Sequence, residues 1–168
     1  MDSGRTIIKR EAQEHSCCFT GHRPQKLLRP GAEIKVDLER AIQHAIYGGF
    51  VSFLTGMACG VGLWAGEIII RLREENPALR LICAVPYPDF PARWSADWKE
   101  RYARIVKEAD EVEVVSLRYH PGVFQWWNEW MVNHSGLVIA VYNGRPGGTR
   151  NTIVYARRQL VPVTILPG

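Results

Sequence analysis

Hydrophobic residues along the chain alternate between short uninterrupted runs and longer segments with helical periodicity. The short runs, which are typical of strands buried on both faces, occupy residues 15–20, 50–55, 79–85, 111–116, 136–142 and 161–166. Between them, apolar positions recur every three or four residues and predict helices over residues 32–47, 60–75, 97–109, 123–133 and 149–159. Such alternation predicts a three-layer α/β/α fold with a mainly parallel sheet of about six strands.

The chain has 168 residues and shows no internal repeat, low-complexity tract or linker, so it is the size of one domain. We expect residues 1–14 to form a flexible N-terminal arm and residues 15–168 to form a single domain. No apolar run reaches the length of a membrane span, and the N-terminus lacks the hydrophobic segment of a signal peptide. A cytoplasmic location without membrane contact is therefore expected.

Composition is that of an ordinary globular protein, with 46% hydrophobic and 23% charged residues. The net charge of +4 favours an anionic ligand, but acids and bases are interspersed, so nucleic acid is possible and not favoured. The four cysteines have no spacing typical of metal ligands, and we expect reduced, mostly buried thiols and no metal site.

Small and polar residues cluster after three of the predicted strands. The clusters are TGHRP (20–24), TGMACGVG (55–62) and YNGRPGGT (142–149). In a parallel sheet the carboxyl ends of the strands share one edge, where helix N-termini offer free N–H groups to anions. Each glycine loop alone is more often a turn, but three at one edge predict a phosphate site. The chain has no GxxxxGK[ST], which disfavours a Walker-type nucleotide hydrolase.

Three side chains in these clusters have chemistry suited to a phosphate. Arg23 can donate two parallel hydrogen bonds, and His22 can donate one or carry a proton. Thr149 stands where its hydroxyl could cap the following helix or meet a phosphate oxygen.

Tryptophans crowd the segment FQWWNEWM, which includes Trp126, Trp127 and Trp130. Core packing explains a part of them. Aromatic residues around so much of one helix also predict a covered surface, and hence a homodimer. Stacking of a nucleobase is a third interpretation, for which Trp94 is the other candidate.

The motifs FTGHRP, TGMACGVGLWAGE, PYPDF with Trp94, and NHSGLVIAVYNGRPGGTRNT occur in the order of the YpsA family of the SLOG superfamily, which the chain resembles from about residue 17 to residue 159. The resemblance implies a Rossmann-like sheet that binds a nucleotide or a nucleotide-derived ligand such as ADP-ribose. More distant relatives include DNA-processing protein A and the LONELY GUY phosphoribohydrolases, which release bases from nucleoside monophosphates.

The resemblance assigns candidate ligand residues by position. Those matching its motifs are Gly21, His22, Arg23, Gly56, Met57, Gly60, Asn128, Gly147, Gly148 and Thr149, with Glu67 as a trailing acid. The loops themselves add Thr55 and Gly144. The chain departs from the family pattern at four positions, where aspartate, arginine, aspartate and aspartate are replaced by Gly62, Trp127, Asn133 and Gly136.

The sequence therefore predicts a cytosolic nucleotide-binding sensor or regulatory module that requires no cofactor and is not a catalyst. The alternative is a phosphoribohydrolase in which Glu67 is the catalytic acid or base. It is the weaker alternative because the helix after PGGT has no acid where the phosphoribohydrolases carry a glutamate. A second alternative is a DNA-associated module.

Overall fold

The computed structural model describes residues 11–168. Six strands form one sheet in the order β4-β3-β2-β1-β5-β6, and every neighbouring pair is parallel. The strands are β1 (Ser16–Gly21), β2 (Ser52–Thr55), β3 (Arg80–Val85), β4 (Glu111–Val114), β5 (Leu137–Tyr142) and β6 (Val163–Pro167). The helices are η1 (Pro24–Lys26), α2 (Gly31–Tyr47), α3 (Val61–Glu75), α4 (Ala96–Glu108), α5 (Val123–Asn133) and α6 (Gly148–Arg158).

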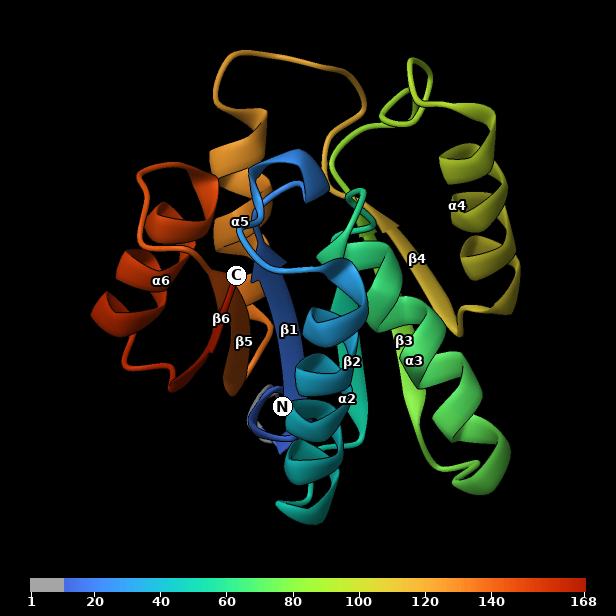
Figure 1. Cartoon of the computed structure of the whole chain (residues 1–168), viewed down its shortest axis with the longest axis vertical. Helices are drawn as coiled ribbons and strands as arrows, with labels where there is room; N and C mark the ends of the chain where they lie inside the picture. The colour runs from blue at the N-terminus through green and yellow to red at the C-terminus, as the bar shows by residue number, and fades with distance from the viewer. Residues whose placement is uncertain (1–10) are drawn as a thin grey trace, which may run out of the picture.

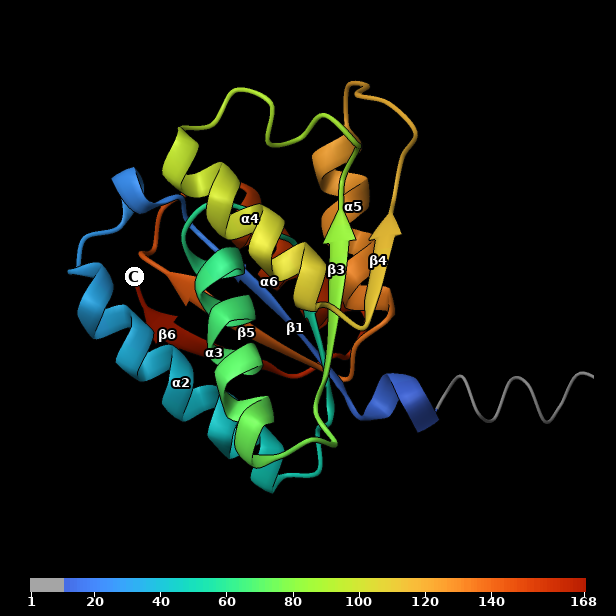
Figure 2. The ribbon, with the colours of Figure 1, turned by 90° about the vertical axis from the view of Figure 1, so that its right-hand side faces the viewer.

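The helices form two layers on opposite faces of the sheet. Figures 1 and 2 show α2, α3 and α4 side by side over one face, with α5 and α6 together over the other. This arrangement follows from right-handed crossovers, because the chain moves outward from β1 to β4 and then returns to the other side of β1. The predicted Rossmann-like three-layer fold is confirmed.

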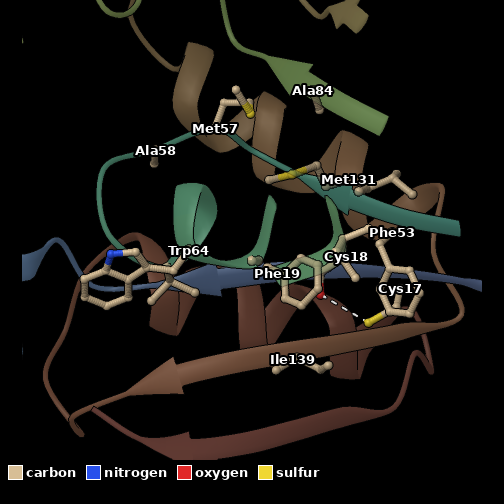
Figure 3. Close-up of a cluster of buried hydrophobic side chains, with 14 of the residues drawn as sticks. Cys17, Cys18, Phe19, Phe53, Met57, Ala58, Trp64, Ala84, Met131 and Ile139 are labelled. Carbon is tan, nitrogen blue, oxygen red and sulfur yellow. Dashed lines mark hydrogen bonds between the residues drawn. The ribbon is translucent and has the colours of Figure 1, made fainter. Parts of the chain in front are cut away.

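The core lies on both faces of β1 and its neighbours (Figure 3). Cys17 and Cys18 are adjacent and point to opposite faces of the sheet, yet both are buried. All four cysteines are free thiols, and burial raises the pKa of Cys18 to about 12. The buried cysteines therefore act as small core residues.

The N-terminal segment differs in part from the expected arm. Residues 11–14 are helical, and Ser16 Oγ donates a hydrogen bond of 2.6 Å to the Ala12 carbonyl. A Cβ at Gly136 would lie 2.7 Å from the Glu14 carbonyl oxygen, so the segment packs closely on the start of β5. Residues 1–10 lie outside the described part of the chain.

The tryptophans of α5 have different environments. Trp127 and Met131 are buried in the core, whereas Trp126 is half exposed. Trp130 stacks on His134, with ring centroids 4.0 Å apart. Core packing thus explains Trp127, and dimerisation through the outer face of α5 stays a prediction.

The strand order fixes where a ligand site is expected. From β1 the chain continues into α2 on one face of the sheet, and from neighbouring β5 it continues into α6 on the other. The two loops diverge and leave a crevice at the carboxyl ends of these strands, which is the usual ligand position in open α/β sheets.

Candidate functional site

A cavity of about 230 Å³ occupies the crevice between the loops that follow β1 and β5. We call it the switch-point cavity. Its lining comes from β1 and η1, from α5, and from the start of α6: Gly21, His22, Arg23, Lys26, Phe124, Trp127, Asn128, Pro146, Gly147, Gly148 and Thr149. Elements far apart in sequence therefore meet around one space.

His22 contributes a buried nitrogen that has no partner within the described chain. The residue is 7% exposed, and its Nε2 atom accepts or donates no hydrogen bond among residues 11–168. The ring stacks on Tyr142 at a centroid distance of 5.6 Å, which fixes its orientation. Burial lowers the pKa of His22, and the charges of Lys26 and Arg145 lower it further. These surroundings favour a neutral imidazole, and a polar ligand would supply the hydrogen bond that its Nε2 atom lacks within residues 11–168.

Arg23 contributes a half-buried guanidinium that forms no ion pair with any acid in residues 11–168. Its Cζ atom lies 5.9 Å from the centre of the Phe90 ring. Burial lowers the pKa of Arg23, since desolvation penalises its charge. A partly desolvated guanidinium without a carboxylate partner in residues 11–168 is suited to binding an anionic ligand.

The N-terminus of α6 supplies backbone donors. No side chain of residues 11–168 caps this helix, whose N-cap is Gly147 with φ 143°. That conformation is open to glycine and strained for other residues. The first N–H groups are thus free of a side-chain acceptor, and they lie beside Asn128, whose Nδ2 would be 3.7 Å from a Cβ at position 148. This is the arrangement that binds phosphate at helix N-termini.

Asn143 joins the two loops that bound the cavity. Its Nδ2 donates a hydrogen bond of 2.7 Å to the Lys26 carbonyl, and its Oδ1 accepts one of 3.0 Å from the Arg145 N–H. The side chain therefore fixes η1 against the loop after β5. Sequence reasoning did not single out Asn143, Lys26, Phe124 or Pro146 as site residues.

The structure brings together only some of the predicted ligand residues. Those lining the switch-point cavity are Gly21, His22, Arg23, Asn128, Gly147, Gly148 and Thr149. Gly144 lies outside the lining, in a turn where its φ of 84° requires glycine-like freedom. Thr55, Gly56, Met57 and Gly60 also lie outside the lining.

The loop after β2 is held by hydrogen bonds within itself and packs against Trp127, which lines the cavity. Thr55 Oγ1 donates a hydrogen bond of 2.5 Å to the Gly62 carbonyl and accepts one from the Met57 N–H. Met57 is fully buried. A Cβ at Gly56 would lie 2.3 Å from Cζ2 of Trp127, and one at Gly60 would lie 2.9 Å from Cδ of Pro24. These glycines permit close packing, so their role here is to support the site.

Glu67 is held away from the switch-point cavity. Its two carboxylate oxygens accept hydrogen bonds of 2.7 Å from Nε and Nη2 of Arg101, and Arg104 adds a third contact at 3.1 Å. Glu67 is absent from the cavity lining. A carboxylate bound on both oxygens is poorly placed for acid or base catalysis in that cavity.

Glu67→Gln is therefore expected to lower stability without changing the affinity for inorganic phosphate. Loss of a bidentate pair that is mostly shielded from solvent should lower the free energy of unfolding by about 1–2 kcal/mol. Thermal denaturation measures this change, with Glu74→Gln, an exposed position on the same helix, as the control. A loss of phosphate affinity in Glu67→Gln at unchanged stability would contradict the structural role.

The four departures from the family pattern lie in different places. Trp127 lines the cavity and donates a hydrogen bond of 2.8 Å from Nε1 to the Ala84 carbonyl. Gly62 lies in the first turn of α3, where its carbonyl accepts the hydrogen bond from Thr55 Oγ1. Asn133 and Gly136 lie at the opposite end of the sheet, where Asn133 Oδ1 accepts a hydrogen bond of 3.0 Å from the Tyr155 hydroxyl. Only the change to Trp127 therefore alters the cavity wall directly.

His22 predicts a specific dependence of stability on pH. Its pKa is lowered in the folded state, so the unfolded chain takes up a proton near pH 6.5 that the folded chain resists. This contribution to stability is present above pH 6.5 and is lost as the pH falls. We expect the melting temperature to fall less steeply below pH 7 in His22→Gln than in the native protein, by calorimetry. His44→Gln, at an exposed histidine on α2, should follow the native profile. Identical profiles for all three proteins would contradict the expectation.

Comparison with protein families identifies the chain. The YpsA model, described as the YspA SLOG family, matches residues 17–160. The chain belongs to this family. The match begins within β1 and contains β2 to β5, and so includes both loops of the switch-point cavity.

Relatives of this YpsA family member include two proteins from Bacillus species. The uncharacterized SPbeta prophage-derived protein YoqJ of Bacillus subtilis (strain 168) is 34% identical over 118 residues, which cover 63% of this chain and 69% of the relative. A UPF0398 protein of Bacillus thuringiensis (strain Al Hakam) is 29% identical over 148 residues, which cover 83% of this chain and 80% of the relative.

Two solved structures share the fold. DNA processing protein A from Helicobacter pylori, described by its single-stranded DNA binding mode, superimposes with a TM-score of 0.65 at 18% identity, covering 96% of this chain and 68% of that one. DNA processing protein A from Streptococcus pneumoniae gives a TM-score of 0.64 at 18% identity, covering 91% of this chain and 50% of that one.

The described part of the chain contains neither a helix that could span a membrane nor a cluster of metal-ligating side chains. Within residues 11–168, no helix is long and apolar enough to cross a membrane. Over the same range, no group of three or more histidine, cysteine, aspartate or glutamate side chains could hold a metal ion.

Proposed function

We propose that this YpsA family member binds a nucleotide or a nucleotide-derived ligand, such as ADP-ribose, through a phosphate group in the switch-point cavity. The observation that carries the proposal is that several hydrogen-bond donors without protein acceptors in residues 11–168 lie around one cavity. Within residues 11–168, Nε2 of buried His22 has no hydrogen-bond partner and the guanidinium of Arg23 has no ion pair. Both residues line the cavity together with the start of α6, which no side chain of the same range caps. Phosphate oxygens would accept hydrogen bonds from all three.

The same cavity supports a binding role over a catalytic one. Within the described range, no aspartate or glutamate is among the residues that line it. Cleavage of an N-glycosidic bond needs an acidic group near the sugar, and Glu67 is committed to Arg101. We therefore propose a sensor or regulatory module in which occupancy of the cavity is the signal.

Ligand-dependent thermal stabilisation tests the proposal. AMP, ADP-ribose, NAD and inorganic phosphate should each raise the melting temperature in a concentration-dependent way, since they bind only the folded chain. Adenosine and ribose, which lack phosphate, serve as matched controls and should give much smaller shifts. The absence of a shift with every phosphate-bearing compound would refute the proposed function.

Single-stranded DNA is a second candidate ligand because basic side chains gather around the cavity. Lys26 lines it, Arg145 is close enough to lower the pKa of His22, and Arg150 lines a neighbouring cavity that shares Pro146. None of the three forms an ion pair with an acid in residues 11–168. Folding thus brings Lys26 of η1 near Arg145 and Arg150, which lie just before and within α6. The resulting positively charged surface around the cavity does not appear as a run of like charge in the sequence.

Salt dependence tests the DNA candidate. Fluorescence anisotropy with a labelled thymidine oligonucleotide should show an affinity that falls steeply with salt, because phosphate contacts release counterions. Arg150→Ala should weaken binding and lower the slope by roughly one, whereas Arg40→Ala, at an exposed site on α2, should change neither. Affinity that is independent of salt would exclude this candidate.

A further inference from the structure

A second cavity shares Arg23 with the switch-point cavity. Its volume is about 300 Å³, and Arg23, Pro24, Gln25, Cys59, Trp94 and Trp98 line it. We call it the tryptophan cavity. Arg23, which forms no ion pair within residues 11–168, belongs to the lining of both cavities and therefore connects them.

Trp94 is held in a fixed orientation by aromatic neighbours. Its ring meets Phe90 edge-to-face at 5.0 Å between centroids, and it meets Tyr102 in the same way at 5.7 Å. Phe90 also lies under Arg23. One network of contacts therefore fixes both the tryptophan and the charged group beside it.

Trp98 is held by the ion pair of Glu67. The guanidinium of Arg101 lies 4.5 Å from the centre of the Trp98 ring, and Glu67 binds Arg101 through both carboxylate oxygens. Glu67, the trailing acid of the family motif, thus supports one wall of the tryptophan cavity through Arg101. A pair of constrained indole rings with an unpaired cation at its border is a surface suited to a planar ring attached to an anion.

We propose that the tryptophan cavity receives the base of a nucleoside diphosphate whose phosphates extend past Arg23 into the switch-point cavity. The inference rests on the proposed function, since it requires phosphate to bind at α6. It adds the place of the base, in the tryptophan cavity, and a chain of two phosphates that contacts both cavities. Trp94 and Trp98 supply the stacking surface, and Arg23 neutralises the phosphates between the two cavities.

Comparison of ADP with inorganic pyrophosphate separates the two parts of the ligand. Isothermal titration calorimetry should show that ADP binds more tightly than pyrophosphate, because only ADP carries a base. Trp98→Ala should weaken ADP binding by roughly 5- to 150-fold, the range for loss of one base–aromatic stack, and should leave pyrophosphate affinity unchanged. Trp98→Phe should recover a part of the loss. Trp126→Ala is the control, since Trp126 is exposed and lines neither cavity.

Nuclear magnetic resonance of the native protein gives a second measurement that needs no destabilising variant. The indole N–H signals of Trp94 and Trp98 should shift with ADP and stay in place with pyrophosphate. Equal affinities for ADP and pyrophosphate, or an ADP affinity that Trp98→Ala leaves unchanged, would overturn the base site while phosphate binding stands. Failure of both compounds to bind would refute the proposed function, and the base site with it.

Discussion

Arg23→Leu is expected to weaken phosphate binding by about 100-fold and, at the same time, to stabilise the ligand-free protein. Removing one partner of a desolvated charge pair costs about 2–5 kcal/mol of binding energy. In the free protein the half-buried guanidinium of Arg23 has no acid within residues 11–168 to offset its desolvation. Leucine removes that penalty, so the free energy of unfolding should rise by about 1 kcal/mol.

Titration calorimetry with ADP or pyrophosphate measures the first effect, and thermal denaturation without ligand measures the second. Arg40→Leu is the control, because the Arg40 side chain is 76% exposed on α2. The opposite signs of the two effects distinguish a binding residue from a structural one. A destabilised Arg23→Leu variant with unchanged affinity would show that Arg23 only supports the fold.

Gly56→Ala is expected to destabilise the protein by about 3 kcal/mol, at the upper end of the cost of overpacking a core. A Cβ at position 56 would lie 2.3 Å from Cζ2 of Trp127, and 3.1 Å from Cε of Met131. Trp127 cannot move away freely, since its Nε1 is bonded to the Ala84 carbonyl. Because Trp127 lines the switch-point cavity, the same substitution should also weaken phosphate binding.

Urea denaturation measures the loss, and Gly148→Ala is the matched control. A Cβ at Gly148 would meet only Asn128 Nδ2, at an ordinary distance of 3.7 Å. Adding Trp127→Leu to Gly56→Ala should recover part of the stability, because residues in direct contact have non-additive effects. Additive losses in the double variant would contradict a direct clash between residues 56 and 127.

The loops after β1 and β5 show what local sequence could predict about the site. Glycine at positions 21, 147 and 148, with His22 and Arg23 beside Gly21, indicates the carboxyl edge of a parallel sheet from the sequence alone. The alternation of strands and helices also determined the fold class, because hydrophobic periodicity reports local geometry and burial directly.

Glu67 and the loop after β2 show where local sequence was insufficient. The glycines between Gly56 and Gly62 predict a phosphate-binding loop. In the structure, Gly56 and Gly60 instead allow close packing of Trp127 and Pro24. Glu67 stands in a motif, yet its partner Arg101 is 34 residues away on α4. Which group a side chain faces depends on how helices pack across the sheet, and no local pattern encodes that distance.

The sequence by itself therefore determined the fold, the sheet edge where the candidate site lies, and the glycine loops after β1 and β5 that border it. Only the tertiary structure decided that Lys26 and Trp127 line the cavity, that Arg101 joins Glu67 to Trp98, and that Arg23 lines two cavities. The physical reason is the range of the interactions. Strand and helix patterns arise from neighbours along the chain, whereas a binding site arises from side chains that only folding brings together.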